Sequence, residues 1–205
     1  MTIYAFDPGR VNNAQLIRDC HQLGYLNDDD VVLDPTYGKG RFWGLWRPAR
    51  LVASDIKGNG LAVNCVDFTN MVAYFDNKFD AVVFDPPYKL GGTSAHPSDG
   101  DYGVADDWNG TKDRMSDIYK GIAECLRVLK PSGILLMKCQ DQVCSGDVVW
   151  QERDFTSQVI GWPDEPAAKL IDKLFVHGAI EQPKGRRQVH ARRNYSTALI
   201  FRKGK

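Results

Sequence analysis

The chain has 205 residues, enough for one well-buried domain, so we expect a single domain over residues 1–205. Hydrophobic residues make up 43% of the sequence and charged residues 25%, a composition that excludes intrinsic disorder, collagen-like repeats and a coiled coil. Basic and acidic residues number 26 each, so the net charge of zero gives no global indication of a polyanionic partner.

The apolar segments are too short for a membrane span. The longest, residues 81–84 and 134–137, fall far below the roughly 20 residues that a spanning helix needs. The amino end has no basic run followed by an apolar core, which excludes a secretory signal. The five cysteines are scattered and include no CxxC pair, so we expect neither a metal site nor a disulfide framework. These features predict a cytoplasmic protein without a membrane partner.

The predicted elements alternate between helix and strand from the amino end onward. Apolar positions recur at helical spacing after Asn12 or Asn13, either of which can cap a helix that ends near Gly24. Residues 31–33 read as a short buried strand, and a second helix is expected to begin within residues 42–46.

The rest of the chain continues this alternation. Further strands are predicted at residues 51–54, 62–66, 79–84, 134–138, 170–176 and 195–201. Helices are predicted from Met115 to Leu129, where Pro131 and Gly133 stop the pattern, and over residues 152–162. Short apolar strands alternating with helices imply a mainly parallel sheet covered on both faces, which binds ligands at the carboxyl ends of its strands.

The loop after the first predicted strand runs from Asp34 to Gly40. Gly38 and Gly40 let a ligand approach the backbone, and the Asp34 carboxylate can hold an ammonium or a hydroxyl group. A dinucleotide fingerprint would need its third glycine one residue before Gly44, and a phosphate-binding loop would need Ser or Thr after Lys39. Neither phosphate motif fits, and taken alone the glycine pair is equally compatible with a simple turn.

Acids also follow the next two predicted strands. Asp55 ends the second strand, where a carboxylate can accept hydrogen bonds from ribose hydroxyls. Asp67 and Phe68 follow the third strand and can bind a purine. The Asp67 carboxylate can accept a hydrogen bond from the exocyclic amine of the purine, and the Phe68 ring can stack on the face of the purine. One aspartate at a strand end is usually structural, but three at successive ends favour a nucleoside-containing ligand.

The fourth predicted strand ends in Asp85-Pro86-Pro87-Tyr88, the most specific motif in the chain. Each proline fixes its own backbone and holds the preceding residue extended, so the Asp85 carboxylate and the Pro86 carbonyl are aimed together. Two rigid acceptors suit a planar amino group with two N–H donors, and Tyr88 offers a face on which the attached ring can stack.

Together these motifs resemble the class I S-adenosylmethionine-dependent amino methyltransferases of nucleic acids, with Asp85 to Tyr88 as the catalytic tetrapeptide. The resemblance implies a Rossmann-like α/β fold: a seven-stranded, mainly parallel sheet with helices on both faces, whose antiparallel last strand lies between the fifth and sixth. It implies S-adenosylmethionine as cofactor. The sequence departs from the DNA-modifying members, which usually carry a separate target-recognition domain, because only 17 residues lie between Asp67 and Asp85; we therefore expect no such domain here. The implied cofactor-binding residues are Asp34, Pro35, Thr36, Gly38, Gly40, Asp55, Ile56, Asp67 and Phe68.

The activity that the resemblance implies is methyl transfer to an exocyclic amino nitrogen of a DNA base, with adenine N6 the leading interpretation. Cytosine N4 of DNA is an alternative, as is an RNA amino methyltransferase acting on adenine N6 or guanine N2. A non-catalytic cofactor- or nucleic-acid-binding protein is disfavoured by the intact Asp85 and Tyr88. A nicotinamide-dependent oxidoreductase is disfavoured by the displaced Gly44.

A local cluster of basic residues predicts where the nucleic acid binds. In the turn between the last two predicted strands, the segment from Lys184 to Arg193 contains five basic residues and no acid: Lys184, Arg186, Arg187, Arg192 and Arg193. With His190, this turn fits phosphate contacts, although a solvated hairpin is the alternative. The long acidic segment 89–112 is interpreted as a flap over the flipped base. The sequence leaves a homodimer open.

Overall fold

The computed structural model describes residues 2–56, 64–87, 111–144, 146–161, 168–178, 187–191 and 193–205. Its strands are β1 (Val31–Asp34), β2 (Arg50–Asp55), β3 (Asn64–Cys65), β4 (Phe79–Phe84), β5 (Leu129–Cys139), β6 (Gln142–Cys144), β7 (Asp147–Val149), β8 (Lys169–His177) and β9 (Tyr195–Arg202). Its helices are α1 (Asn13–Gln22), α2 (Thr111–Val128) and α3 (Gln151–Ile160), with a single 3₁₀ turn, η1 (Arg41–Trp43).

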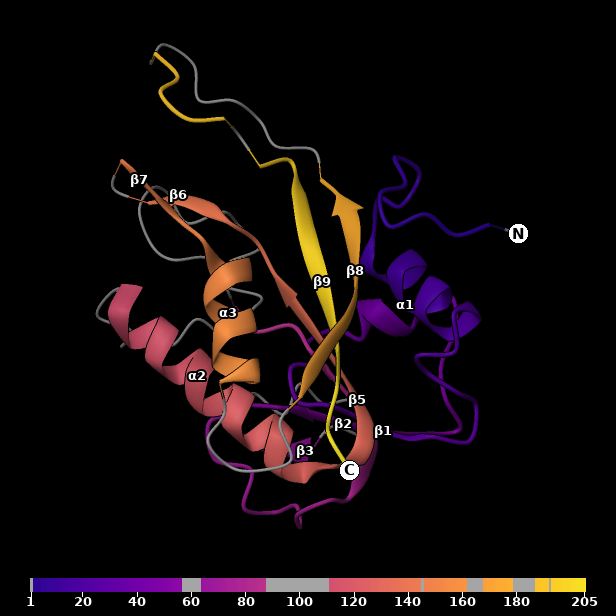
Figure 1. The fold of residues 1–205 in the computed structure, drawn as a ribbon. Coiled ribbons are helices and arrows are strands. Elements are labelled where there is room, and N and C mark those ends of the chain that lie inside the picture. The colour runs from indigo at the N-terminus through magenta and orange to yellow at the C-terminus, as the bar shows by residue number, and fades with distance from the viewer. Residues whose placement is uncertain are drawn as a thin grey trace.

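Seven strands form one sheet in the order β3-β2-β1-β4-β5-β9-β8, and β6 and β7 form a separate hairpin. Strands β1 to β5 pair in parallel, whereas β9 runs antiparallel to both of its neighbours, β5 and β8. The last strand is thus inserted between β5 and β8, as Figure 1 shows. This arrangement confirms the predicted Rossmann-like α/β fold class.

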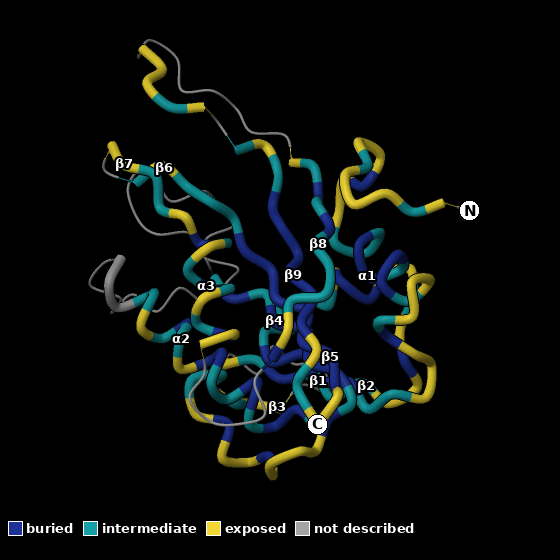
Figure 2. Tube along the Cα trace, viewed as in Figure 1, coloured by how far each residue is buried: buried dark blue, intermediate teal, exposed yellow. Residues whose placement is uncertain are grey.

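Helices cover both faces of the sheet because successive side chains of a strand point to opposite faces. Along β4, Val82 and Phe84 join the core beneath α2 and α3, whereas Ala81 and Val83 join the core beneath α1 and η1. Figure 2 shows the buried residues concentrated along the central strands between these layers. Strands that are apolar on both faces therefore sit at the centre, which leaves their ends to carry polar chemistry.

The predicted limits of the first helix are confirmed. The Asn12 side chain accepts a hydrogen bond from the backbone N–H of Gln15 at 2.9 Å, which satisfies a donor that the first turn leaves unpaired. The chain leaves the helix through Gly24, whose φ of +77° is in the left-handed region that favours glycine.

The structure differs from the sequence analysis at two places, one wrong prediction and one element that the sequence does not predict. The helix expected to begin within residues 42–46 is wrong, because only the 3₁₀ turn η1 forms there. Gly44 costs helix stability and Pro48 disfavours a helical conformation for Arg47, so the turn does not propagate. The β6–β7 hairpin was not predicted, since strands of three residues carry too little alternation to detect.

No helix in the described part of the chain combines the length and the apolar character that a membrane crossing requires.

Candidate functional site

The carboxyl ends of β1, β2, β4 and β5 meet at one edge of the sheet, hereafter the carboxyl edge. Asp34 ends β1, Asp55 ends β2, Asp85 follows β4, and Lys138 is the second-last residue of β5. Because the strands are parallel neighbours, four charged side chains from distant parts of the sequence are brought to this edge. The β6–β7 hairpin and the amino end of β9 extend from the same end of the molecule (Figure 1).

The loop after β1 is held open by backbone conformation and by β2. Gly38 and Gly40 have φ of +52° and +69°, in the left-handed region. A Cβ atom on Gly40 would lie 2.6 Å from the Tyr37 hydroxyl oxygen, so a side chain has no room there. The Gly38 N–H donates to Asp55 Oδ2 at 2.8 Å, which fixes the loop to the end of β2. The sequence-predicted glycine pair and Asp55 are therefore in direct contact.

Asp34 supports this loop from inside. Only 1% of its surface is exposed. Its Oδ1 accepts the backbone N–H of Thr36 at 3.0 Å, and its Oδ2 accepts the indole N–H of Trp43 at 2.8 Å. Burial raises the pKa of Asp34 to about 7, against the effect of those two donors, and the Asp85 charge raises it further. The geometry gives Asp34 a role in shaping the loop.

The tetrapeptide is tied to the same loop. The backbone N–H of Asp85 donates to Thr36 Oγ1 at 2.9 Å, so the first residue of the tetrapeptide and the glycine loop form one unit. Pro86 is buried and Pro87 is half-buried beside it. Tyr88, the fourth predicted catalytic residue, lies outside the described residues.

The described residues do not supply hydrogen-bond donors to both oxygens of the Asp85 carboxylate. Its side chain is 17% exposed, and its Oδ1 is buried with no hydrogen-bond partner among the residues that the structure describes. Burial raises the pKa of Asp85, and the Lys138 ammonium 3.7 Å from Oδ1 opposes that shift. A buried acceptor without a donor is costly in a folded protein, which makes this atom a candidate ligand contact.

Lys138 is a residue of this site that the sequence motifs did not reveal. It is 5% exposed, and its Nζ atom lies 5.8 Å from the centre of the Phe42 ring. The only sequence signal is a charged residue within the otherwise apolar end of β5, Ile134 to Cys139. Lysine is almost never fully buried without a partner, so that position indicates a charge to be matched.

The remaining predicted cofactor residues lie around the edge in different environments. Asp67 is exposed, and its Oδ1 accepts the backbone N–H of Thr69 at 2.8 Å. Phe68 packs inward, with its ring centre 5.3 Å from that of Phe84. A Cβ atom on Gly121 of α2 would lie 2.7 Å from the Phe68 ring, so this glycine admits the ring against the helix. Ile56 is exposed and Pro35 is buried.

The basic turn is described in part. Lys184, Arg186 and Arg192 lie outside the described residues, as do residues 89–110 of the predicted flap, whereas Arg187 and Arg193 lie within them.

Arg193 joins the turn to the site's neighbourhood. Its guanidinium carbon lies 4.9 Å from the Trp150 ring centre, and its carbonyl oxygen accepts from Gln140 Nε2 at 3.1 Å. His190 Nε2 donates to the Gly146 carbonyl at 2.7 Å. These contacts set the turn against the β6–β7 hairpin and the start of α3, close to the end of β5.

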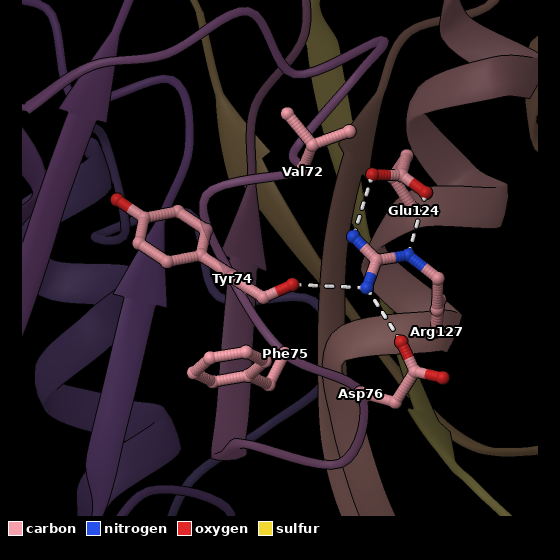
Figure 3. Close-up of a pocket in the computed structure, with 6 residues that line it drawn as sticks. All are labelled: Val72, Tyr74, Phe75, Asp76, Glu124 and Arg127. Atoms are coloured by element: carbon pink, nitrogen blue, oxygen red, sulfur yellow. Dashed lines mark hydrogen bonds and ion pairs between the residues drawn. The ribbon is translucent and has the colours of Figure 1, made fainter.

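A pocket lies at the opposite, amino-terminal edge of the sheet (Figure 3). Its lining residues are Val72, Tyr74, Phe75, Asp76, Glu124 and Arg127. They come from the segment before β4 and from the last turns of α2, which precedes β5. No residue predicted to be functional lies in this pocket, so the candidate site is the carboxyl edge.

Comparisons with known proteins identify the fold. No protein-family model matches the sequence, and no curated protein matches it. A suspected methyltransferase from Bacillus halodurans has a TM-score of 0.58 at 15% identity, with 92% of this chain and 99% of that chain covered. An rRNA methylase from Streptococcus thermophilus has a TM-score of 0.52 at 15% identity, covering 95% and 98%. A SAM-dependent methyltransferase from Methanosarcina mazei has a TM-score of 0.51 at 13% identity, with 89% of this chain and 96% of that chain covered. The chain therefore has the fold of the S-adenosylmethionine-dependent methyltransferases.

Proposed function

We propose that this protein transfers a methyl group from S-adenosylmethionine to an exocyclic amino nitrogen of a base in DNA, most directly adenine N6. The observation that carries this proposal is the contact between Asp85 and Thr36, at 2.9 Å, which joins the tetrapeptide to the glycine loop. The acceptor for an amino group and the loop for a cofactor are thereby held side by side, as methyl transfer between two bound molecules requires.

The residues of the carboxyl edge fit this cofactor. The left-handed Gly38 and Gly40 leave backbone open to a ligand where a Cβ atom on Gly40 would collide with Tyr37. Asp55 lies at the end of β2 for the ribose hydroxyls, and the exposed Asp67 is available for the adenine amine. S-adenosylmethionine, when bound, supplies an electrophilic methyl group on a positively charged sulfur that leaves as a neutral thioether.

The tetrapeptide makes the target amine a better nucleophile. An aryl amine is a weak nucleophile because its lone pair is delocalised into the ring. The Asp85 carboxylate and the Pro86 carbonyl accept its two N–H groups, which favours a tetrahedral nitrogen whose lone pair points at the methyl carbon. That lone pair forms the new N–C bond while the C–S bond breaks, and the cationic product nitrogen then loses one proton to the Asp85 carboxylate or to water.

The polymer is proposed to bind along the basic turn and the β6–β7 hairpin. Arg193 lies on Trp150, which is 43% exposed, so a cation and an open aromatic face are presented together. Arginine contacts phosphates and aromatic rings stack with bases, which suits nucleic acid held near the carboxyl edge. We propose a target base turned out of its duplex, with Tyr88 as its stacking partner.

The experiment that tests this function supplies methyl-tritiated S-adenosylmethionine together with separate pools of unmethylated DNA and RNA. Digestion to nucleosides and mass spectrometry then identify the product. N6-methyladenine from DNA supports the proposal, whereas N4-methylcytosine from DNA, or methylated adenine or guanine from RNA, replaces it with one of the alternatives. Label in neither pool, from protein that binds the cofactor, contradicts nucleic-acid methylation.

A further inference from the structure

Lys138 faces Asp85 from the neighbouring strand. The register of β4 and β5 pairs Phe84 with Met137, so the next residues along, Asp85 and Lys138, lie opposite each other at the carboxyl edge. The Lys138 side chain is 6% exposed and its Nζ atom lies 3.7 Å from Asp85 Oδ1. A buried lysine beside a buried carboxylate is rare unless each matches the other's charge.

The groups that face Asp85 come from two strands. In the described part of the chain they are Lys138 and Cys139 of β5 and Asp34 of β1. Burial raises the pKa of the Cys139 thiol well above its ordinary value, so this group is neutral near pH 7. Asp34 is either neutral or negative and cannot stabilise a second negative charge. The cation among these groups is Lys138.

The separation of 3.7 Å matters for the chemistry. It is beyond direct hydrogen-bond length for Oδ1, so Lys138 acts on this oxygen through its charge, and no described residue occupies the hydrogen-bonding capacity of Oδ1. The Phe42 ring, 5.8 Å from Nζ, lines one side of the ammonium group. An arginine fork would instead tend to occupy the carboxylate oxygens directly.

We propose that Lys138 is a positioning residue whose charge keeps Asp85 ionised as the acceptor for the target amino group. The effect on methyl transfer rests on the proposed function, in which Asp85 accepts an N–H group of the target amine. Only an ionised Asp85 can accept an N–H at either of its two oxygens. A protonated Asp85 would instead present one O–H donor to the amine. The ion pair thus decides whether the tetrapeptide can receive its target.

The first test needs no activity. Carboxyl-carbon NMR of the full chain follows the titration of Asp85 in wild type, in Lys138→Met and in Lys173→Met. Lys173 is the matched control, a lysine 2.7 Å from the Glu152 carboxylate and 41% exposed. We expect Asp85 to titrate about one to three pH units higher in Lys138→Met than in wild type, and unchanged in Lys173→Met. The same titration midpoint in all three proteins overturns the proposal.

The second test is the pH profile of methyl transfer at saturating cofactor. The acidic limb of kcat should move to higher pH in Lys138→Met, by the same amount as the NMR titration, and stay in place in Lys173→Met. A uniform loss of rate with an unmoved limb would mean a merely structural role and overturns the proposal.

A third test titrates Lys138 in a variant of Asp85, so that the proposal can still be tested if Lys138→Met does not fold. In Asp85→Asn, nitrogen NMR should find that the Lys138 ammonium loses its proton at lower pH than in wild type, because its counter-charge is gone. An unchanged Lys138 titration contradicts the ion pair. If the NMR shifts occur but wild type methylates neither DNA nor RNA, the proposed function fails while the pairing of Lys138 with Asp85 stands.

Discussion

At the amino-terminal edge of the sheet, Arg127 donates to both carboxylate oxygens of Glu124 at 2.8 Å, to Asp76 at 2.6 Å and to the carbonyl oxygen of Tyr74 at 3.0 Å (Figure 3). It also donates to the carbonyl oxygen of Met71 at 3.0 Å. At the carboxyl edge, Lys138 stays 3.7 Å from Asp85, whose Oδ1 has no hydrogen-bond partner among the described residues. Both edges place a basic side chain beside an acidic one. At the amino-terminal edge the hydrogen-bonding groups of the basic side chain are all paired, whereas at the carboxyl edge one carboxylate oxygen has no partner among the described residues.

The difference separates a structural charge cluster from a candidate site. Every donor group of Arg127 is engaged by the protein, and those bonds raise the pKa of the guanidinium above its ordinary value. The cluster joins α2 to the segment before β4 and leaves nothing for a ligand to complete. At the carboxyl edge the described residues leave an acceptor, Asp85 Oδ1, for a partner to satisfy, although the pocket lies at the amino-terminal edge.

The largest expected effect follows from removing that acceptor. Asp85→Ala should lower the rate of methyl transfer at least about 1,000-fold, because the amine loses its charged hydrogen-bond partner. Cofactor affinity should stay within a few fold, measured by calorimetry, since Asp85 acts on the target. Asp55→Ala is the counterpart, expected to weaken cofactor binding by about 1 to 3 kcal/mol. Loss of cofactor binding in Asp85→Ala would instead make the tetrapeptide a structural turn.

The amino-terminal cluster should affect stability alone. Arg127→Met is expected to lower the free energy of unfolding by roughly 2 kcal/mol, because the Glu124 carboxylate and two backbone carbonyls lose their donor. Urea unfolding measures this loss, and methyl transfer per folded molecule should equal that of wild type. A drop in transfer rate at unchanged stability would show that the amino-terminal edge takes part in function.

A smaller effect distinguishes two left-handed glycines. Gly40→Ala and Gly24→Ala both place a side chain at positive φ, at a cost of about 1 to 2 kcal/mol each. Only Gly40 also has the Tyr37 ring within 3.1 Å of the new Cβ atom, whereas Gly24 has nothing within 4 Å. We therefore expect weaker cofactor binding in Gly40→Ala and normal binding in Gly24→Ala by calorimetry. Equal cofactor affinities in the two variants would remove the glycine loop from the cofactor site.

The smallest expected effect concerns the basic turn. Arg193→Ala should reduce the log-log slope of nucleic-acid affinity against salt by about 0.7 to 0.9, the amount for one phosphate contact. Fluorescence anisotropy with a labelled oligonucleotide at several salt concentrations measures that slope, with Arg153→Ala, an exposed arginine of α3, as control. A slope identical to wild type would mean that the Arg193 side chain serves only to pack on Trp150.

The sequence predicted the strands that end at the carboxyl edge because they are short, apolar and closed by an acid or by prolines. The same features place Asp34, Asp55 and Asp85 at the carboxyl edge from the sequence alone. It could not reveal Lys138, because a lysine near the end of a strand ordinarily extends to solvent and its partner lies about 50 residues away in the sequence. The inward packing of Phe68 likewise depends on Gly121, a helix residue that local pattern does not connect to it.

An amide NMR titration of the full chain with S-adenosylmethionine tests whether the carboxyl edge binds the cofactor. We expect shifts for the amides of Gly38, Gly40 and Ile56, and none for Val72 and Arg127 at the amino-terminal edge. Shifts confined to the amino-terminal pocket, or no shifts at millimolar cofactor, would contradict the assignment of the carboxyl edge as the methyltransferase site.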